Sequence, residues 1–566
     1  MNAGERALWR RAQWRVNVRP AMMMPRMRKR FRYLVPLVAG IAFAAGAQTS
    51  FRLPDLGSSA AALISPTEEQ AYGADMLHQM RAMDLVLDDP LVDAYVSSLG
   101  YRLVAVSDEP KQKFTFFVVR DSQINSFAAP GGYVGVNAGL IIATHSESEL
   151  AAVLAHEIAH ITQHHLERAF EDARKTTPLM ALALLGAIAA GAAGGSNGNA
   201  PIAILAGGEG LVAQRQLNFT RHDEEEADRV GIGTLARAGF DPEAMARFFQ
   251  RMQEDLRPDR GSGDLPQLLQ THPVTSQRIS EAEARAHVIE EQMRAHPPAI
   301  YAVGSHWQTS IEPLPYVRHP GELIAYARSA DGEEGSGAYA LYALMRERVR
   351  VLMSDQPNTL ADYYARNLRQ HPTFDTPANH YGYALTLIRL GDGSAALRQL
   401  KPLLAAHPDN LPLRLATAHA EQVAGARAAS LQRYAAITRD WPRNHAVALA
   451  YAKALLADGK ADGAPEAAHL LKPLLDDADE PDLYRTYGRA ADLAGQPIRA
   501  AEAYADATFL AGQPADALDQ LQRLARRSDL DYYQRARIEA RIAWITPIVL
   551  EMRKRHLRQQ DGSGSG

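Results

Sequence analysis

Residues His156, Glu157 and His160 form the pattern H-E-x-x-H, the strongest chemical signal in the chain. On a helix, two histidines four residues apart share a face, so both imidazoles can reach one metal ion while Glu157 holds a water molecule beside it. With 19 histidines in 566 residues, a chance match is expected roughly 0.04 times. The pattern therefore predicts a metal site that activates water.

An acidic run at 222–228 supplies candidates for the remaining metal ligand. A catalytic zinc ion needs a third protein ligand and one open position. Glu224 and Asp228 lie four residues apart on a predicted helix that ends at Gly239. One can bind the metal while the other accepts the N–H of a ligating histidine. A solvated helix start, favoured by the helix dipole, is the alternative interpretation.

The chain contains no cysteine. Disulfides and thiolate chemistry are therefore excluded, and any metal site must use His, Asp or Glu. His164 and His165, just past the motif, are most simply interpreted as solvent-facing.

The elements around the motif are a small sheet and a long helix. Segments 114–119 and 133–136 are aromatic or β-branched, which predicts strands. Ser146 and Glu149 have the spacing of a capping box, and apolar residues continue at helical spacing over 150–161. The H-E-x-x-H pattern is therefore expected on a capped helix that directly follows the sheet.

The glycine-rich strand before this helix is a candidate substrate site. Gly132, Tyr133 and Val134 follow a Pro-Gly-Gly turn. An edge strand here would pair with the backbone of an extended substrate with little sequence preference. An ordinary sheet strand is the alternative.

Segment 176–208 carries no charged residue. Its apolar part is marginal in length for crossing a bilayer. The favoured interpretation is a helical hairpin or lid over the site, with peripheral membrane contact through 176–208. A transmembrane span, and hence an integral-membrane protein, is the alternative.

The second half of the chain is rich in alanine and leucine. Three glycines lie 34 residues apart, at Gly391, Gly425 and Gly459. A 34-residue period with small residues at helix turns is the tetratricopeptide spacing. Region 355–545 is therefore predicted to be an all-α tetratricopeptide-repeat solenoid, with a generic helical bundle as the alternative.

The charge is distributed unevenly along the chain. The net charge is -4, yet residues 1–32 hold ten basic side chains and one acidic side chain, which leaves the rest strongly acidic. A chain that acidic is a poor polyanion binder, so no nucleic acid is expected as a partner.

The amino-terminal segment has the parts of a secretory signal. After the basic stretch comes an apolar run at 33–45 that ends in Ala45-Gly46-Ala47. These parts predict a signal peptide cleaved after Ala47, with an uncleaved anchor as the alternative. The predicted organisation is signal peptide 1–47, a domain at 48–290 that carries the metal site, linker 291–354, repeat domain 355–545 and a basic, flexible tail 546–566.

Together these motifs resemble the HtpX/Ste-type zinc metallopeptidases, a gluzincin family. The resemblance rests on H-E-x-x-H, on E-x-x-A-D at 224–228, on the segment 125–132, and on His272-Pro273 followed by Arg278. It implies an α+β zincin-like domain, mainly helical with a small sheet. It also implies one Zn²⁺ per subunit, with Glu224 as the third ligand beside His156 and His160.

A peptidase mechanism follows from these residues. Zinc would lower the pKa of its bound water toward about 7, and Glu157 would take the proton and later protonate the leaving amine. His272 or Arg278 would stabilise the oxyanion, a role worth roughly 3 to 4 kcal/mol for one donor. In the resembling family the His272 position can also approach the metal and close the open site as a latch.

Exported members of the family that carry tetratricopeptide repeats imply a cellular role. The expected function is a periplasmic zinc metalloendopeptidase in outer-membrane protein quality control, which degrades misassembled β-barrel proteins and assists their assembly. Expected partners are unfolded or misassembled outer-membrane proteins and the outer-membrane β-barrel assembly machinery. The alternative is a repeat-based chaperone or scaffold with little proteolysis.

Overall fold

The computed structural model describes residues 65–169, 220–255, 266–295, 341–476 and 478–562. The predicted signal peptide, the segment 176–208 and residues 296–340 of the predicted linker lie outside the described residues. Within the described ranges, no helix is both long and apolar enough to cross a membrane.

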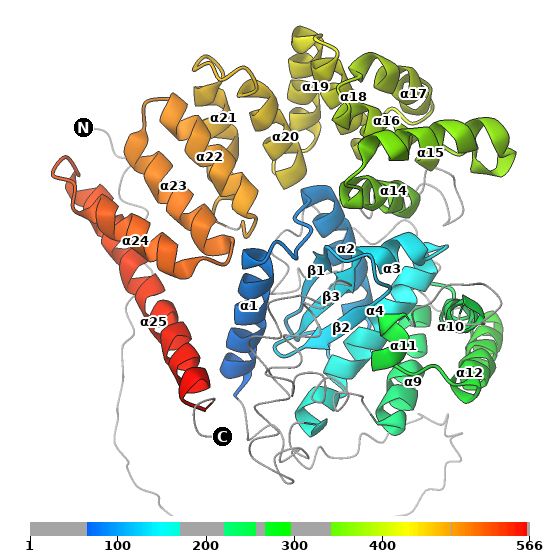
Figure 1. The fold of residues 1–566 in the computed structure, drawn as a ribbon. Helices are drawn as coiled ribbons and strands as arrows, with labels where there is room; N and C mark the ends of the chain where they lie inside the picture. The colour runs from blue at the N-terminus through cyan, green and yellow to red at the C-terminus, as the bar shows by residue number, and fades with distance from the viewer. Residues whose placement is uncertain (1–64, 170–219, 256–265, 296–340, 477, 563–566) are drawn as a thin grey trace, which may run out of the picture. The chain divides into compact units, whose positions relative to one another are not determined.

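The described residues before position 296 are mainly helical and form one small sheet, as the sequence predicted (Figure 1). Its elements are α1 (Pro66–Ala82), α2 (Pro90–Val104), β1 (Thr115–Val119), β2 (Ser126–Ala129), β3 (Tyr133–Asn137), α3 (Ala138–Ala143), α4 (Glu147–Thr162), α9 (Arg221–Arg237), α10 (Ala244–Asp255), α11 (Gln267–Thr271) and α12 (Ser276–Ala295).

The sheet has the strand order β1-β3-β2. Strand β3 pairs in parallel with β1 on one side and antiparallel with β2 on the other. The two predicted strand segments are thus confirmed as β1 and β3, whereas β2 was not predicted as a strand. Gly131 and Gly132 have φ of +75° and +80°, and their turn brings β3 back alongside β2.

This strand order corrects the predicted substrate site. Gly132, Tyr133 and Val134 lie at the start of the central strand and not at an edge, because β1 and β2 already bond both sides of β3. Tyr133 is only 7% exposed and Val134 is fully buried. Neither can pair with a substrate backbone, so the edge-strand interpretation is wrong.

Helix α4 carries the H-E-x-x-H pattern through the core. It packs against α9 and β2, and nearly all of its residues are buried. The Ser146 hydroxyl accepts a hydrogen bond from the Glu149 N–H, which confirms the predicted start of the helix. Glu149 departs from a capping box, because its carboxylate accepts instead from the backbone N–H of His145 and forms an ion pair with Arg251.

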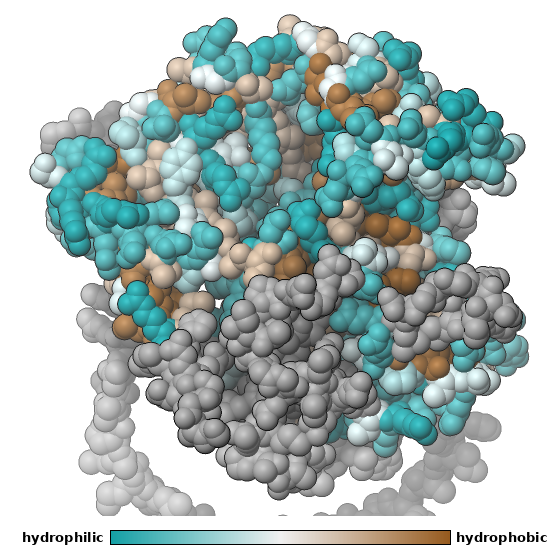
Figure 2. Space-filling model, in the orientation of Figure 1, coloured by the Kyte–Doolittle hydropathy of each residue, from teal (hydrophilic) through white to brown (hydrophobic). Residues whose placement is uncertain are grey.

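The region after residue 340 consists of consecutive helices. They are α14 (Leu341–Met353), α15 (Pro357–Gln370), α16 (Pro377–Arg389), α17 (Gly393–Ala406), α18 (Leu411–Val423), α19 (Arg427–Asp440), α20 (His445–Leu455), α21 (Ala464–Leu471), α22 (Pro481–Leu493), α23 (Pro497–Leu510), α24 (Pro514–Ala525) and α25 (Tyr532–Gly562), with 3-10 turns at Pro372–Phe374 and Lys472–Leu474. Figure 2 shows mainly hydrophilic residues on the visible face of these helices.

The three glycines with the 34-residue spacing lie where the sequence placed them, at turns between helices. Gly391, Gly425 and Gly459 have φ of +83°, +81° and +69°. Left-handed backbone of this kind favours glycine, because it carries no Cβ. Each helix from α16 to α25 packs against the next one in the chain. The tetratricopeptide assignment itself stays a prediction.

The sequence predicted a flexible tail from residue 546 onward, and the structure corrects this boundary. Helix α25 continues through this position to Gly562. Ile545 is fully buried and Val549 is 3% exposed, because both belong to an apolar cluster shared with α23 and α24. Their burial keeps this part of the chain helical and packed.

Helices α2 and α14 join the two regions through a partly buried ion pair. The Asp89 carboxylate accepts two hydrogen bonds from Arg348, at 2.7 and 2.6 Å, and also caps α2 by accepting from the Val92 N–H. Burial alone would raise the pKa of Asp89, but the contact with Arg348 lowers it below its usual value. Nearby, the Tyr342 hydroxyl donates to the backbone carbonyl of Thr144. Helix α14, at the end of the predicted linker, is therefore packed against the first region.

Candidate metal and active site

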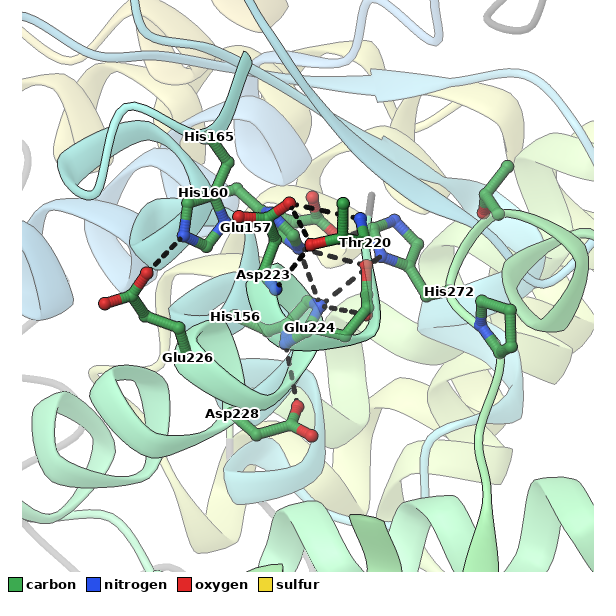
Figure 3. A network of polar contacts seen from close by, with 12 residues as sticks. His156, Glu157, His160, His165, Thr220, Asp223, Glu224, Glu226, Asp228 and His272 are labelled. Atoms are coloured by element: carbon green, nitrogen blue, oxygen red, sulfur yellow. Dashed lines mark hydrogen bonds and ion pairs between the residues drawn. The ribbon is translucent and has the colours of Figure 1, made fainter. Parts of the chain in front are cut away.

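Three segments of the chain bring polar side chains together in the core (Figure 3). His156 and His160 project from α4, Glu224 comes from the first turn of α9, and His272 follows α11. Helix α9 begins with a full capping box between Thr220 and Asp223, which fixes the turn that carries Glu224. The sequence had predicted His156, His160 and Glu224 as one group, and the structure places them together.

The donor atoms of this group have the spacing that a small metal ion requires. His156 Nε2 lies 3.0 Å from His160 Nε2 and 3.4 Å from His272 Nδ1. Glu224 Oε1 lies 2.9 Å from His272 Nδ1 and 3.6 Å from His160 Nε2. A tetrahedral zinc ion with bonds of about 2.0 Å places its ligands about 3.3 Å apart. The four residues, each at most 5% exposed, therefore fit a tetrahedral metal ion.

Glu157 lies beside this group and is fully buried. Its Oε1 accepts a hydrogen bond of 2.7 Å from the hydroxyl of Ser126 on β2. Its Oε2 is buried and has no hydrogen-bond partner among the described residues. One carboxylate oxygen is thus fixed and the other is free to bind a water molecule. Sequence reasoning did not single out Ser126, although the residue falls in the family landmark 125–132.

Asp228 supports the first histidine of the motif. Its Oδ1 lies 3.0 Å from His156 Nδ1, the ring nitrogen on the side away from the donor group. Burial opposes a charge on His156, but the carboxylates of Asp228 and Glu224 outweigh burial and raise its pKa to about 10. The surroundings of His156 therefore favour a positive charge, which a proton or a bound cation can supply.

Arg278 faces the carboxylates of the site. Its Nε and Nη2 donate to the two oxygens of Asp228, and its Nη1 lies 3.0 Å from Glu224 Oε2. Nη1 also donates to the backbone carbonyl of Pro273. This geometry indicates that Arg278 holds Asp228 and Glu224 in place, and it does not favour the expected oxyanion role.

Two further groups have the protonation states that metal binding requires. Burial, together with the charge of His156, shifts the pKa of His160 well below its usual value, so its imidazole is neutral. Burial would raise the pKa of Glu224, but its contacts with His272 and His156 shift that pKa well below the usual value. A neutral imidazole and an ionised carboxylate are the forms that bind a metal ion.

The two histidines after the motif differ from each other. His164 has φ of +54°, and its side chain is 47% exposed, as the sequence predicted. His165 is fully buried, so its solvent-facing assignment is wrong. The left-handed residue at 164 breaks α4 and turns residue 165 back toward the site, where its Nδ1 lies 2.8 Å from His160 Nδ1. The helical spacing of the sequence did not indicate this break.

A buried His/Glu group with H-E-x-x-H on a helix is the arrangement of a metallopeptidase. Residues 90–286 match peptidase family M48. The chain is also 34% identical over 510 residues to the beta-barrel assembly-enhancing protease of Escherichia coli strain K12. This match covers 88% of this chain and 92% of that protein. The chain therefore belongs to peptidase family M48, which confirms the resemblance inferred from its motifs.

Other relatives match over shorter stretches. The putative beta-barrel assembly-enhancing protease of Vibrio cholerae serotype O1 is 35% identical over 359 residues, 63% of this chain and 64% of that protein. The match thus spans slightly less than two thirds of that relative. The mitochondrial metalloendopeptidase OMA1 of Schizosaccharomyces pombe is 34% identical over 194 residues, 33% of this chain and 51% of that protein.

Proposed function

We propose that this M48 peptidase is a zinc metalloendopeptidase in which His156, His160 and Glu224 hold one zinc ion. The observation that carries the proposal is the spacing of the three donors: His156 Nε2 lies 3.0 Å from His160 Nε2 and 3.4 Å from Glu224 Oε2, and His160 Nε2 lies 3.6 Å from Glu224 Oε1. The set of two imidazoles and one carboxylate leaves a fourth position for water or substrate, as catalytic zinc sites do.

Glu157 is the proposed general base and acid. A zinc ion in this site supplies Lewis-acid activation of water and of the scissile carbonyl. With Oε1 held by Ser126, Glu157 presents Oε2 to the attacking water, accepts its proton and passes that proton to the leaving amine. Burial of this carboxylate beside the donor group keeps bulk water away from the proton that it carries.

His272 has two proposed roles that exclude each other at any one moment. Its Nδ1 lies among the donor atoms, where it would fill the fourth position and latch the site. Its Nε2 lies 3.9 Å from Glu157 Oε1, so a small movement of the ring away from Glu224 would free the position and leave an N–H near the reacting carbonyl. In the second position, His272 would stabilise the oxyanion.

The proposed substrates are misassembled outer-membrane β-barrel proteins, handled in the periplasm together with the β-barrel assembly machinery. The name beta-barrel assembly-enhancing protease carried by relatives supports this proposal, and the signal peptide predicted from the sequence agrees with it. Tetratricopeptide repeats over the helices after residue 355 would offer a surface for unfolded chains. A chaperone or scaffold role without cleavage is the second candidate, favoured by the extent of this helical region.

Digestion of an unfolded porin by the purified protein and by Glu157→Gln, with zinc content measured on both, tests the function. We expect the wild type to hold about one zinc ion and to cleave the porin, and Glu157→Gln to keep the zinc and lose cleavage by about 10²- to 10⁴-fold. A wild type that binds zinc without cleaving would overturn the peptidase proposal. An assembly phenotype that survives Glu157→Gln would belong to the scaffold role.

A further inference from the structure

We propose that His165, together with Glu226 and Arg168, forms a relay that positions the metal ligand His160. None of these three residues is a predicted metal ligand. The proposal rests on the proposed function only because it requires a metal ion bound to His160. In this relay His165 is a positioning residue, because it touches the ligand histidine and not the donor group itself.

The contact between the two histidines fixes where their protons lie. His160 Nε2 faces the donor group, so this nitrogen must be unprotonated when it binds a metal, and the ring proton then lies on Nδ1. His165 Nδ1 lies 2.8 Å from His160 Nδ1 and accepts a hydrogen bond from this N–H. The proton of His165 therefore lies on Nε2, which donates to Glu226 Oε2 at 3.2 Å (Figure 3).

The far end of the relay is anchored to α9. Arg168 Nη2 donates to Glu226 Oε2 at 2.9 Å and to Asp223 Oδ1 at 3.0 Å. Asp223 belongs to the capping box that begins α9, one residue before Glu224. The same set of contacts thus orients His160 on α4 and ties it to the turn that carries the carboxylate of the site.

A second metal ion is the competing interpretation of this cluster. His165, Asp223 and Glu226 have atoms close enough together to hold one. The guanidinium of Arg168 already lies within hydrogen-bond distance of both carboxylates, and His165 Nδ1 is directed at His160. A cation added there would face this positive charge, so the geometry favours the relay.

The contacts of His160 through the relay resemble those of the other motif histidine, His156. His156 has a carboxylate at its Nδ1, and that carboxylate is held by Arg278. His160 has a neutral imidazole in the equivalent place, followed by a carboxylate and an arginine. Partners of this kind set the tautomer and ring orientation of metal-bound histidines, and their loss typically costs 10- to 100-fold in metal affinity.

Zinc affinity of the purified protein, measured by competition with a chromophoric chelator, tests the relay without depending on activity. We expect His165→Leu to raise the zinc Kd by about 10- to 100-fold. His165→Asn should recover much of the affinity, because its amide oxygen can accept from His160 Nδ1. His164→Asn is the matched control and should bind zinc as the wild type does, since its exposed side chain contacts Glu109 and Glu167.

The outcomes separate the relay from its alternatives. An unchanged zinc Kd in His165→Leu would overturn the relay, and a second zinc equivalent in the wild type that this variant loses would establish a metal site there instead. If His165→Leu does not fold, Glu226→Ala carries the test and should also weaken zinc binding; an unchanged Kd would overturn the relay. Because Kd is measured without a peptide substrate, failure of the peptidase proposal would appear separately, as zinc binding without cleavage.

Discussion

Arg278 donates to both carboxylate oxygens of Asp228, from Nε at 2.7 Å and from Nη2 at 2.8 Å. Asp228 in turn lies 3.0 Å from His156 Nδ1, so the arginine acts on the metal ligand through the aspartate. Arg278 and Asp228 are 4% and 6% exposed, respectively. We therefore infer that the pair positions His156: the spacing of the sequence predicted this kind of role for Asp228, whereas it did not predict that Arg278 holds the aspartate in place.

Replacement of Arg278 by methionine should destabilise the protein. The substitution leaves Asp228 and Glu224 as buried carboxylates without their cationic partner, which typically costs 3 to 5 kcal/mol. Urea unfolding measures this loss of unfolding free energy. Arg278→Lys should recover part of it, because lysine keeps the positive charge but cannot form the bidentate contact with the carboxylate. A large fall in kcat with unchanged unfolding would instead support the oxyanion role.

Replacement of Ser126 by alanine should slow cleavage without removing the metal. Glu157 Oε1 would lose the hydroxyl that fixes it, a contact worth about 1.5 to 3 kcal/mol for a charged acceptor, so kcat should fall by roughly tenfold or more. KM and zinc content should stay near those of the wild type. Ser126→Thr keeps a hydroxyl and serves as the control; equal kcat values for wild type and Ser126→Ala would contradict the prediction.

Replacement of His272 by alanine should distinguish its two proposed roles. If Nδ1 fills the fourth position in the resting site, its removal opens that position, and cleavage of unfolded porin should increase while zinc stays bound by the other three donors. If His272 instead stabilises the oxyanion, kcat should fall by about 10²- to 10³-fold. Zinc content and initial rates, measured on the same preparations, decide between these results.

Acidification should weaken the contact between α1 and α23. His78 packs edge-on against Phe509, with ring centroids 5.1 Å apart. Burial, reinforced by the charge of Arg81, lowers the pKa of His78 to about 4. Since the unfolded chain titrates near pH 6.5, it binds this proton first on acidification. The stability due to neutral His78 is therefore complete above about pH 6.5 and is lost as the pH falls from about 6.5 to 4.

A histidine substitution checks this pH dependence. His78→Gln cannot titrate, so its free energy of unfolding should fall less than that of the wild type between pH 7.5 and pH 5, by about 1 to 2 kcal/mol. His287→Gln is the control, because its side chain is 64% exposed and should contribute no such difference. Identical pH profiles for His78→Gln and the wild type would show that His78 is not responsible.

Local patterns were sufficient to predict the elements that carry the site. The spacing of His156 and His160, the Ser146 cap and the glycine that ends α9 all act within one or two helical turns, and each lies where the sequence placed it. The 34-residue glycine spacing likewise identified turns from local backbone preference. Such features depend on neighbours in the sequence, which a single chain displays directly.

Features that depend on distant contacts were predicted less well. The central position of β3 follows from pairing on both sides, which its own residues do not encode. The burial of His165 follows from a backbone break at His164 and from a carboxylate on another helix. Helix α25 continues past residue 546 because Val549 packs into a cluster with earlier helices. In each case the outcome depends on a partner that lies outside the segment itself.

The ion pair between Asp89 and Arg348 also limits how this protein can be divided. Asp89 caps a helix of the peptidase region, yet its charge is balanced by a residue that follows the predicted peptidase boundary by almost sixty positions. A fragment that ends at residue 290 would leave this aspartate without its cation beside an uncovered apolar surface. The smallest autonomous catalytic unit should therefore include α14, and a chimera that exchanges the helical region between relatives should keep α14 with the peptidase.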